Sequence, residues 1–259
     1  MLSNQVTTKA MWINADLGEG CAHDEELFKI VDWANIACSG HAGDKSSMRN
    51  ACELALEHGV QVGAHPSYPD KAGFGRTRPQ MDSVGLLAEL QRQMDLFENI
   101  AAKTGCATAH FKPHGQLYND AAFDAETAKL LIELARKFPH LKLLALAESP
   151  QVELSRKAGI VVVEEAFPDR AYMGNGALVP RSQPGAVIQD PEQVKAQAVS
   201  IIRQGPLMCL DGSSRVLRAQ TLCVHGDTEQ ALANAQAVRQ ALIEHDQVMF
   251  SGADCFIWQ

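Results

Sequence analysis

The 259-residue sequence lacks the short motifs that mark several large enzyme classes. It contains no Gly-Lys dipeptide, and therefore no Walker A loop for nucleotide phosphates. It also contains no GxSxG, HExxH or GxGxxG, so nucleophile-elbow hydrolases, zincins and dinucleotide-binding enzymes lose support. Any use of ATP would therefore need an unusual site or a partner chain.

Paired cysteines, basic runs and long apolar stretches are also scarce. The seven cysteines form no CxxC pair, which favours reduced, mostly buried thiols over a disulfide framework. Acidic residues outnumber basic ones by 31 to 23, so nucleic acids and anionic membranes are poor partners. No apolar stretch approaches the roughly 18 residues of a membrane span, and the first residues lack the apolar core of a signal peptide. We therefore expect a cytoplasmic protein.

What the sequence does contain is an alternation of short apolar runs and helical patterns. Apolar residues make up 46% of the chain, enough for a large core. The apolar runs predicted to be strands are residues 11–16, 33–38, 60–64, 108–111, 141–145, 160–164 and 221–224. The segments predicted to be helical are 24–31, 44–58, 82–105, 124–137, 150–158, a helix starting at 190, and 227–245. Such an alternation predicts an α/β fold with a mainly parallel sheet.

Polar residues follow nearly every predicted strand instead of gathering at one point of the sheet. DLGEG follows WINA, CSGHAGD follows ANIA, KPHG follows TAHF, and HGD follows TLCV. In barrels of alternating strands and helices, active sites lie at the carboxyl ends of the strands. We therefore predict a distorted seven-stranded (β/α) barrel. It forms one domain over residues 1–259, with terminal extensions at 1–10 and 246–259.

Carboxylates and histidines at these strand ends are the candidate catalytic residues. Carboxylates act as bases or metal ligands, and histidine carries protons near neutral pH. The strand ends supply Asp16, Glu19, His41, His65, His114 and His225. The sequence does not say which of them is the general base. Asp44 and Asp227 follow two of the strands and are also explained as helix N-caps.

Lys112, one residue past the apolar part of its strand, is the most specific candidate for substrate binding. Burial of an ammonium is costly without an anionic partner, so Lys112 suits a substrate carboxylate or a developing oxyanion. We expect Lys112→Met to fold with stability near wild type and to lose turnover. The other substrate-binding candidates are Asp70, Arg76, Asn119, Arg170 and Arg181, of which the two last lie in a Gly/Pro-rich loop at 166–189.

Several ordered segments resemble one known family. NADLGEG, ANIACSGHAGD, GAHPSYPDKAGFGR, KPHGQLYN, FPDRAY with LVPRSQPGAVI, and CVHGDT look like the LamB/YcsF family from about Trp12 to His245. The resemblance implies a barrel of the glycoside hydrolase/deacetylase type. It also implies the A subunit of a prokaryotic 5-oxoprolinase, which uses ATP with Mg²⁺ to open the lactam of 5-oxoproline to L-glutamate. The implied partners are B and C subunits.

Two other functions stay open. One is a metal-dependent amide or acetyl hydrolase, in which Asp16, His41 and His65 bind a divalent ion, because oxygen and imidazole ligands suit such ions. The other is a non-catalytic subunit that delivers substrate to its partners. In each case we expect one shared pocket at the carboxyl ends of the strands, formed by Asp16, His41, His65, Lys112, His114 and His225.

Overall fold

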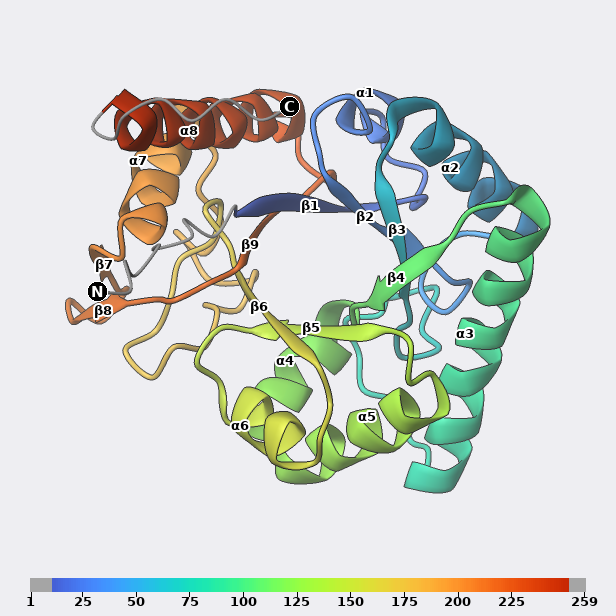
Figure 1. Ribbon diagram of the computed structural model, residues 1–259. Helices are drawn as coiled ribbons and strands as arrows, with labels where there is room; N and C mark the ends of the chain where they lie inside the picture. Colours follow the sequence, from blue (N-terminus) through green and yellow to red (C-terminus); the bar gives the residue numbers. More distant parts are fainter. Residues whose placement is uncertain (1–10, 252–259) are drawn as a thin grey trace, which may run out of the picture.

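The computed structural model describes residues 11–251, and the side chains as far as residue 245, as a closed parallel barrel. Around the ring the strands are β1 (Trp12–Leu17), β2 (Trp33–Ala37), β3 (Gln61–His65), β4 (Thr108–Phe111), β5 (Lys142–Leu146), β6 (Val162–Ala166) and β9 (Thr221–Val224). β9 pairs with both β1 and β6 and so closes the ring at the centre of Figure 1. The predicted barrel is confirmed.

Helices cover the outside of the ring (Figure 1). They are α1 (Asp24–Leu27), α2 (Lys45–His58), α3 (Ser83–Thr104), α4 (Gly115–Phe123), α5 (Ala125–Lys137), α6 (Pro150–Lys157), α7 (Pro191–Ile202) and α8 (Ala231–Ser251). An antiparallel hairpin, β7 (Pro206–Met208) and β8 (Ser214–Val216), lies outside the ring. None of the helices in residues 11–251 has the length and apolarity needed to cross a bilayer.

The barrel is distorted between β3 and β4, where the pairing changes register between Val62 and Gly63. A Cβ at Gly63 would lie 2.3 Å from the imidazole ring of His110. Real Cβ atoms do not approach a neighbour so closely, so only glycine leaves room for this ring. The irregular strand pair therefore admits a polar ring to the interior of the barrel.

The interior of the barrel contains a connected polar layer. Asn14 Nδ2 donates to Thr221 Oγ1 at 2.9 Å, and Asn35 Nδ2 donates to Asn14 Oδ1 at 2.8 Å. His110 Nε2 lies 2.8 Å from Asn35 Oδ1. Asn35 Nδ2 also donates to Asp16 Oδ1 at 2.9 Å. Because buried polar groups are stable only when hydrogen-bonded, this layer fixes the side chains that lead to the carboxyl end of the barrel.

The opposite end of the barrel is closed by aromatic rings. Trp12 and Trp33 begin β1 and β2, and their rings stack with centroids 5.1 Å apart. Trp33 stacks in turn on His110, with centroids 5.0 Å apart. Leu144 and Val163 complete this small apolar cluster. The amino-terminal end of the barrel is therefore filled by packed side chains.

The structure differs from the predicted elements in four places. KPHG leads directly into α4, which the sequence pattern does not predict, because Gly115 (φ +59°) begins this short helix and His114 caps it without a side-chain hydrogen bond. The α-helix predicted at 24–31 ends at Leu27. Asp227 is not the N-cap of α8, which begins at Ala231. Of the predicted terminal extensions, 246–251 continue α8, and 1–10 and 252–259 lie outside the described residues.

Candidate functional site

The carboxyl ends of the strands surround a cavity of about 340 Å³. His41 and His65 lie behind the cavity wall, in contact with Glu19. The structure therefore brings all six residues expected in a shared pocket to the same end of the barrel. The predicted site residues that line the cavity are Asp16, Glu19, Arg76, Lys112, His114, Asn119, Arg170, Arg181 and His225.

Asp70, predicted to bind substrate, is not part of the cavity wall and shapes its own loop instead. Its Oδ1 accepts from the backbone N–H of Gly73 at 2.8 Å, and its Oδ2 accepts from that of Thr77 at 3.0 Å. These bonds hold a tight turn in which Phe74 adopts φ +56°, a conformation that bulky residues rarely take. The turn presents the carbonyl of Phe74 to His114 Nε2 at 3.0 Å.

Lys112 is a buried ammonium held between two carboxylates. Its Nζ lies 2.9 Å from Asp16 Oδ1 and 3.2 Å from Glu165 Oε1, and it donates to Cys223 Sγ at 3.0 Å. Burial lowers the pKa of Lys112, but Asp16, Cys223 and Glu165 outweigh burial and raise it well above its usual value. Lys112 is therefore charged and already paired. It suits a carbonyl oxygen or a developing oxyanion better than another carboxylate.

Asp16 is held in its ionised form by its contacts with Lys112 and His65. Burial raises the pKa of Asp16, but His65 and Lys112 outweigh burial and lower it well below its usual value. Its Oδ1 accepts from Lys112 and Asn35, and its Oδ2 lies 3.3 Å from His65 Nε2. Asp16 thus links the buried ammonium to a group of histidines.

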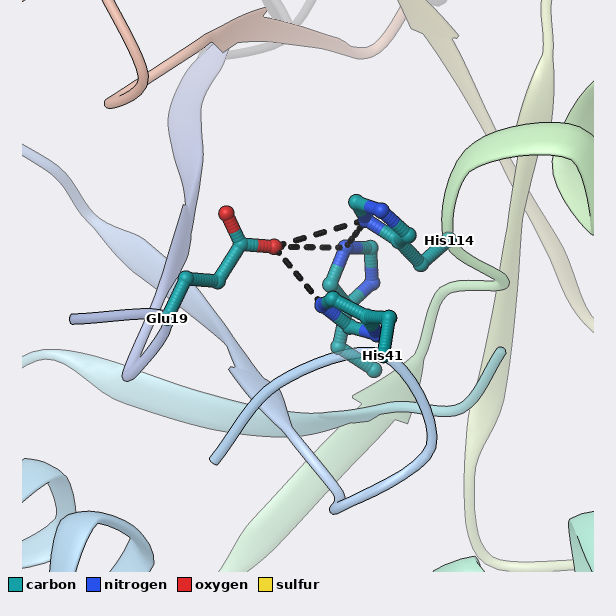
Figure 2. Close-up of side chains that lie close together, drawn as sticks. Glu19, His41 and His114 are labelled. Carbon is teal, nitrogen blue, oxygen red and sulfur yellow. Dashed lines mark hydrogen bonds and ion pairs between the residues drawn. The ribbon is translucent and has the colours of Figure 1, made fainter. Parts of the chain in front are cut away.

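Three histidines and Glu19 converge at the cavity wall, and Figure 2 shows Glu19 with His41 and His114. Glu19 Oε1 lies 2.9 Å from His41 Nε2, 3.4 Å from His114 Nδ1 and 3.8 Å from His65 Nε2. The rings of His41 and His114 stack face to face, with centroids 3.6 Å apart. Burial lowers the pKa of His41 to about 2 and that of His114 well below its usual value. The imidazoles of these two histidines are therefore neutral.

His225, on the other side of the cavity, is oriented by Asp169. The Nδ1 of His225 lies 2.7 Å from Asp169 Oδ2, which also accepts from the backbone N–H of His225 at 3.1 Å. Burial raises the pKa of Asp169, but His225, Arg170 and Arg181 outweigh burial and lower it. An ionised Asp169 accepts from Nδ1–H, so in the neutral form of the ring the lone pair lies on Nε2. Such a histidine is suited to accept a proton.

Arginines give the mouth of the cavity a positive charge. The carboxylate of Asp227 bridges Arg76 at 2.8 Å and Arg181 at 3.2 Å, so two guanidinium groups share one carboxylate. Arg170 has another role, because it is buried and donates to the backbone carbonyls of Val179 and Ala186. Arg76 and Arg181 are therefore the better placed groups for an anionic substrate.

Sequence reasoning assigned no role to Glu165 or Cys223 and did not pair Asp169 with His225. Glu165 stands in the apolar run VVVEEAF and is fully buried. A carboxylate inside such a run is a signal in itself, because it is costly without a partner. The side chain of Cys223 gave no comparable signal, and the contact of Asp169 with His225 joins segments 56 residues apart.

Comparison with known proteins gives the family of this barrel. The sequence profile of the LamB/YcsF family matches residues 11–254. The chain belongs to the LamB/YcsF family. The resemblance seen in the six motifs is thereby confirmed.

Two solved structures show how far this similarity extends. The lactam utilization protein from Thermus thermophilus is 39% identical with a TM-score of 0.83, and the alignment covers 91% of this chain and 97% of that one. A putative cellobiose-phosphate cleavage protein from Enterococcus faecalis is 14% identical with a TM-score of 0.51, over 90% and 93% of the two chains. The second similarity shows the fold alone.

Proposed function

We propose that this LamB/YcsF protein is the A subunit of an ATP-dependent 5-oxoprolinase that opens the lactam of 5-oxoproline to L-glutamate with B and C subunits. The proposal is carried by one cavity that brings three kinds of group together. It is lined by Lys112, whose ammonium is paired with Asp16, and by His225, which Asp169 orients. It is also lined by Arg76 and Arg181, two guanidinium groups that share one carboxylate. The 39% identical relative, a lactam utilization protein by name, supports a lactam as substrate. The cavity volume of about 340 Å³ suits one small molecule.

The substrate has two polar ends that match the two sides of the cavity. Its carboxylate is an anion, for which Arg76 and Arg181 supply charge at the mouth. Its lactam oxygen gains negative charge as the ring opens, and Lys112 is placed to stabilise that charge. In this orientation Asp16 and Glu165 hold the ammonium in position and do not contact the substrate.

Ring opening requires an activated carbonyl and a nucleophilic water, because the amide is stabilised by resonance. In our proposal ATP transfers its terminal phosphoryl group to the lactam oxygen, which releases ADP and activates the carbonyl carbon. His225, held by Asp169, accepts the proton of the attacking water and returns a proton to the ring nitrogen as the C–N bond breaks. A second water hydrolyses the acyl phosphate that remains, which yields the carboxylate of glutamate and inorganic phosphate. The chain contains no Walker A motif, and its cavity is small, so we assign binding of ATP and Mg²⁺ to a site completed by the B and C subunits.

The proposal is tested by measuring glutamate released from 5-oxoproline by this chain, alone and with its B and C partners, with and without Mg-ATP. We expect release only from the complete complex with ATP. His225→Gln should abolish release, and the matched control His140→Gln, at an exposed histidine paired with Glu98, should not. Full turnover by the His225→Gln complex would favour a non-catalytic delivery subunit.

Metal-dependent amide hydrolysis is the second candidate function. It is favoured by the convergence of Glu19, His41, His65 and His114 (Figure 2). The ligand set predicted from the sequence was Asp16, His41 and His65, and the structure instead commits one oxygen of Asp16 to Lys112 and Asn35. Hydrolysis of an amide by this chain alone, without ATP, would establish this second function in place of the first.

A further inference from the structure

We propose that Glu19, His41, His65 and His114 form a binding site for one divalent transition-metal ion at the cavity wall. One carboxylate oxygen and three ring nitrogens lie within 4.8 Å of one another. The four residues come from separate segments of the chain, and the side chains of Glu19, His41 and His114 point toward one another in Figure 2. The three histidines are 0–6% exposed, so packing fixes their positions.

The protonation of the rings supports a cation at this centre. His65 Nδ1 lies 2.7 Å from the carbonyl oxygen of Lys112, and His114 Nε2 lies 3.0 Å from that of Phe74. A carbonyl oxygen only accepts, so both of these nitrogens carry hydrogen. In neutral rings the other nitrogens, His65 Nε2 and His114 Nδ1, then present lone pairs. These two lone pairs face each other across 2.9 Å.

Two facing lone pairs repel each other unless a positive charge lies between them. A proton on His65 Nε2 would relieve this repulsion and would also face Asp16 Oδ2, at 3.3 Å. A metal ion would also use the lone pair of His41 Nε2 and the oxygen of Glu19, which are 2.9 Å apart. One metal ion at this centre therefore accounts for the convergence of all four side chains.

The outer contacts of the cluster also match those of metal-bound histidines. Such histidines usually donate their second ring N–H to a carbonyl or carboxylate oxygen, which fixes the ring and its tautomer. The carbonyls of Lys112 and Phe74 do this for His65 and His114. The unusual backbone conformation of Phe74 thus has a function, since it aims the carbonyl at His114.

The ligand set selects the class of ion. Three imidazoles and one carboxylate favour Zn²⁺, Co²⁺ and similar ions over Mg²⁺ and Ca²⁺, which prefer oxygen. Glu19 and His114 line the cavity, so the site is accessible to a ligand there. When bound, such an ion supplies Lewis-acid polarisation of a carbonyl. The inference rests on the ligand geometry and would stand if the chain acted on a different substrate.

The test is metal binding by the full-length chain, with no activity assay. Protein purified without chelator is analysed for metal content, then stripped with a chelator and titrated with Co²⁺ alone. We expect a single ion per chain and a visible absorption band typical of Co²⁺ bound by imidazole. Excess Mg²⁺ should leave the band unchanged, and Zn²⁺ should remove it by displacement.

Variants separate this site from adventitious binding. Glu19→Gln and His114→Gln should each weaken Co²⁺ binding by more than the roughly 10- to 100-fold that loss of an outer hydrogen-bond partner costs. His140→Gln removes an exposed histidine far from the cluster in sequence and should bind Co²⁺ like wild type. Circular dichroism checks that each variant is folded. If a histidine variant does not fold, Glu19→Gln and the wild-type titration still decide the question.

Equal binding by the wild type and the Glu19 variant would overturn the inference. If stripped wild-type protein binds neither Co²⁺ nor Zn²⁺ more tightly than Glu19→Gln does, there is no metal site. Nitrogen NMR of the histidines would then be expected to show an imidazolium in the His65–His114 pair, with a proton taking the place of the ion. The ATP-dependent assay of the complete complex is independent of this result.

Discussion

The acidic neighbours of Lys112 determine what its substitution is expected to do. Its side chain is 3% exposed, and its ammonium contacts the carboxyl groups of both Asp16 and Glu165. Removing one partner from such a group leaves the others uncompensated, which costs more free energy than the intact group contributes. This arrangement changes the expectation from the sequence that Lys112→Met would have stability near wild type.

We expect Lys112→Met to lower the free energy of unfolding by about 3–5 kcal/mol. We also expect turnover of the reconstituted complex to fall by about 2–4 kcal/mol in transition-state stabilisation, the scale of one electrostatic donor. Urea unfolding and steady-state kinetics measure the two effects. Lys137→Met, at an exposed lysine at the end of α5, is the matched control and should change neither. Wild-type stability of Lys112→Met would contradict the paired ammonium.

Asp169 is a positioning residue, because it acts through His225. Asp169→Asn keeps the shape of the side chain but no longer favours hydrogen on Nδ1 of His225. We expect kcat to fall by about 100-fold or more, on the scale of general-base catalysis, with little change in KM. Asp211→Asn, at an exposed aspartate in the β7–β8 turn, should leave kcat unchanged. An equal loss through KM alone would instead indicate a role in substrate binding.

The same substitution should alter stability in acid. Because the pKa of Asp169 is lowered in the folded chain, its carboxylate contributes stability that is fully present above its unfolded pKa of about 3.9. That contribution is lost as the pH falls through the folded pKa. We expect Asp169→Asn to lose less stability than wild type between neutral pH and the region below about pH 4. Parallel acid-unfolding curves would contradict the lowered pKa.

At the scale of residues, the sequence predicts positions better than partners. Asp16, Lys112 and His225 could be placed at one end of the barrel because parallel strands end on the same side. Their partners Glu165 and Asp169 depend on strand register and on the path of a long loop. Neither the strand register nor the path of this loop can be predicted from the spacing of residues along the sequence. Asp70 shows the converse, because a polar side chain in a functional loop can serve the loop itself.

The elements differ in how well local patterns specify them. Asp44 lies just before α2, and from this position we predicted it to be the N-cap. The structure shows Asp44 at the N-cap, in a capping box that also involves Ser47. α4 was not predicted, because it is only nine residues long and the residue before it, His114, is not a typical N-cap. The segment between β6 and α7 was predicted to be a long loop, and its internal bridges, such as Arg170 with Val187, could not be read from composition.

The long loop between β6 and α7 is held together by Arg170. Its guanidinium donates to Val179 O at 2.6 Å and to Ala186 O at 3.1 Å, so one side chain ties two arms of the loop. Lysine offers a single point of donation in place of this planar fork. The Arg170→Lys variant therefore leaves at least one of these carbonyls without its partner.

We expect Arg170→Lys to speed amide hydrogen exchange at residues 171–187 and to raise KM in the reconstituted complex more than it lowers kcat. The reason is that the loop lines the cavity through Leu178, Pro180 and Arg181 and would sample more conformations. Arg203→Lys, at an exposed arginine after α7, is the control. Unchanged exchange in the loop would show that Arg170 does not hold it.

The molecule as a whole depends on a seam between the two ends of the chain. β1 is the first strand of the described residues and β9 the last, and their pairing closes the barrel. Thr221 spans this seam, donating to the carbonyl of Trp12 at 3.0 Å and accepting from Asn14 at 2.9 Å. The residues paired here are more than 200 positions apart in the sequence, so bringing them together costs a large loop-closure entropy. We therefore expect the seam to form late in folding.

We expect Thr221→Val to cost about 1–3 kcal/mol, because Asn14 and Trp12 lose a buried partner. The loss should appear mainly as faster unfolding, since the seam forms after the main folding barrier. Denaturant-dependent folding and unfolding rates measure this. Thr104→Val is the control, because its hydroxyl bonds only to Ile100 in the same helix. A slower folding rate with unchanged unfolding would place closure before the barrier.

The stacked indoles of Trp12 and Trp33 give this barrel an optical property of its own. The rings are nearly parallel, at 18°, and belong to neighbouring strands of the ring. Two such chromophores in contact couple their excited states, so we expect the pair to contribute its own signal to the circular dichroism spectrum. That signal exists only while β1 and β2 are aligned at their first residues. The chain therefore carries an internal label for the integrity of the barrel, which reports on it without any added dye.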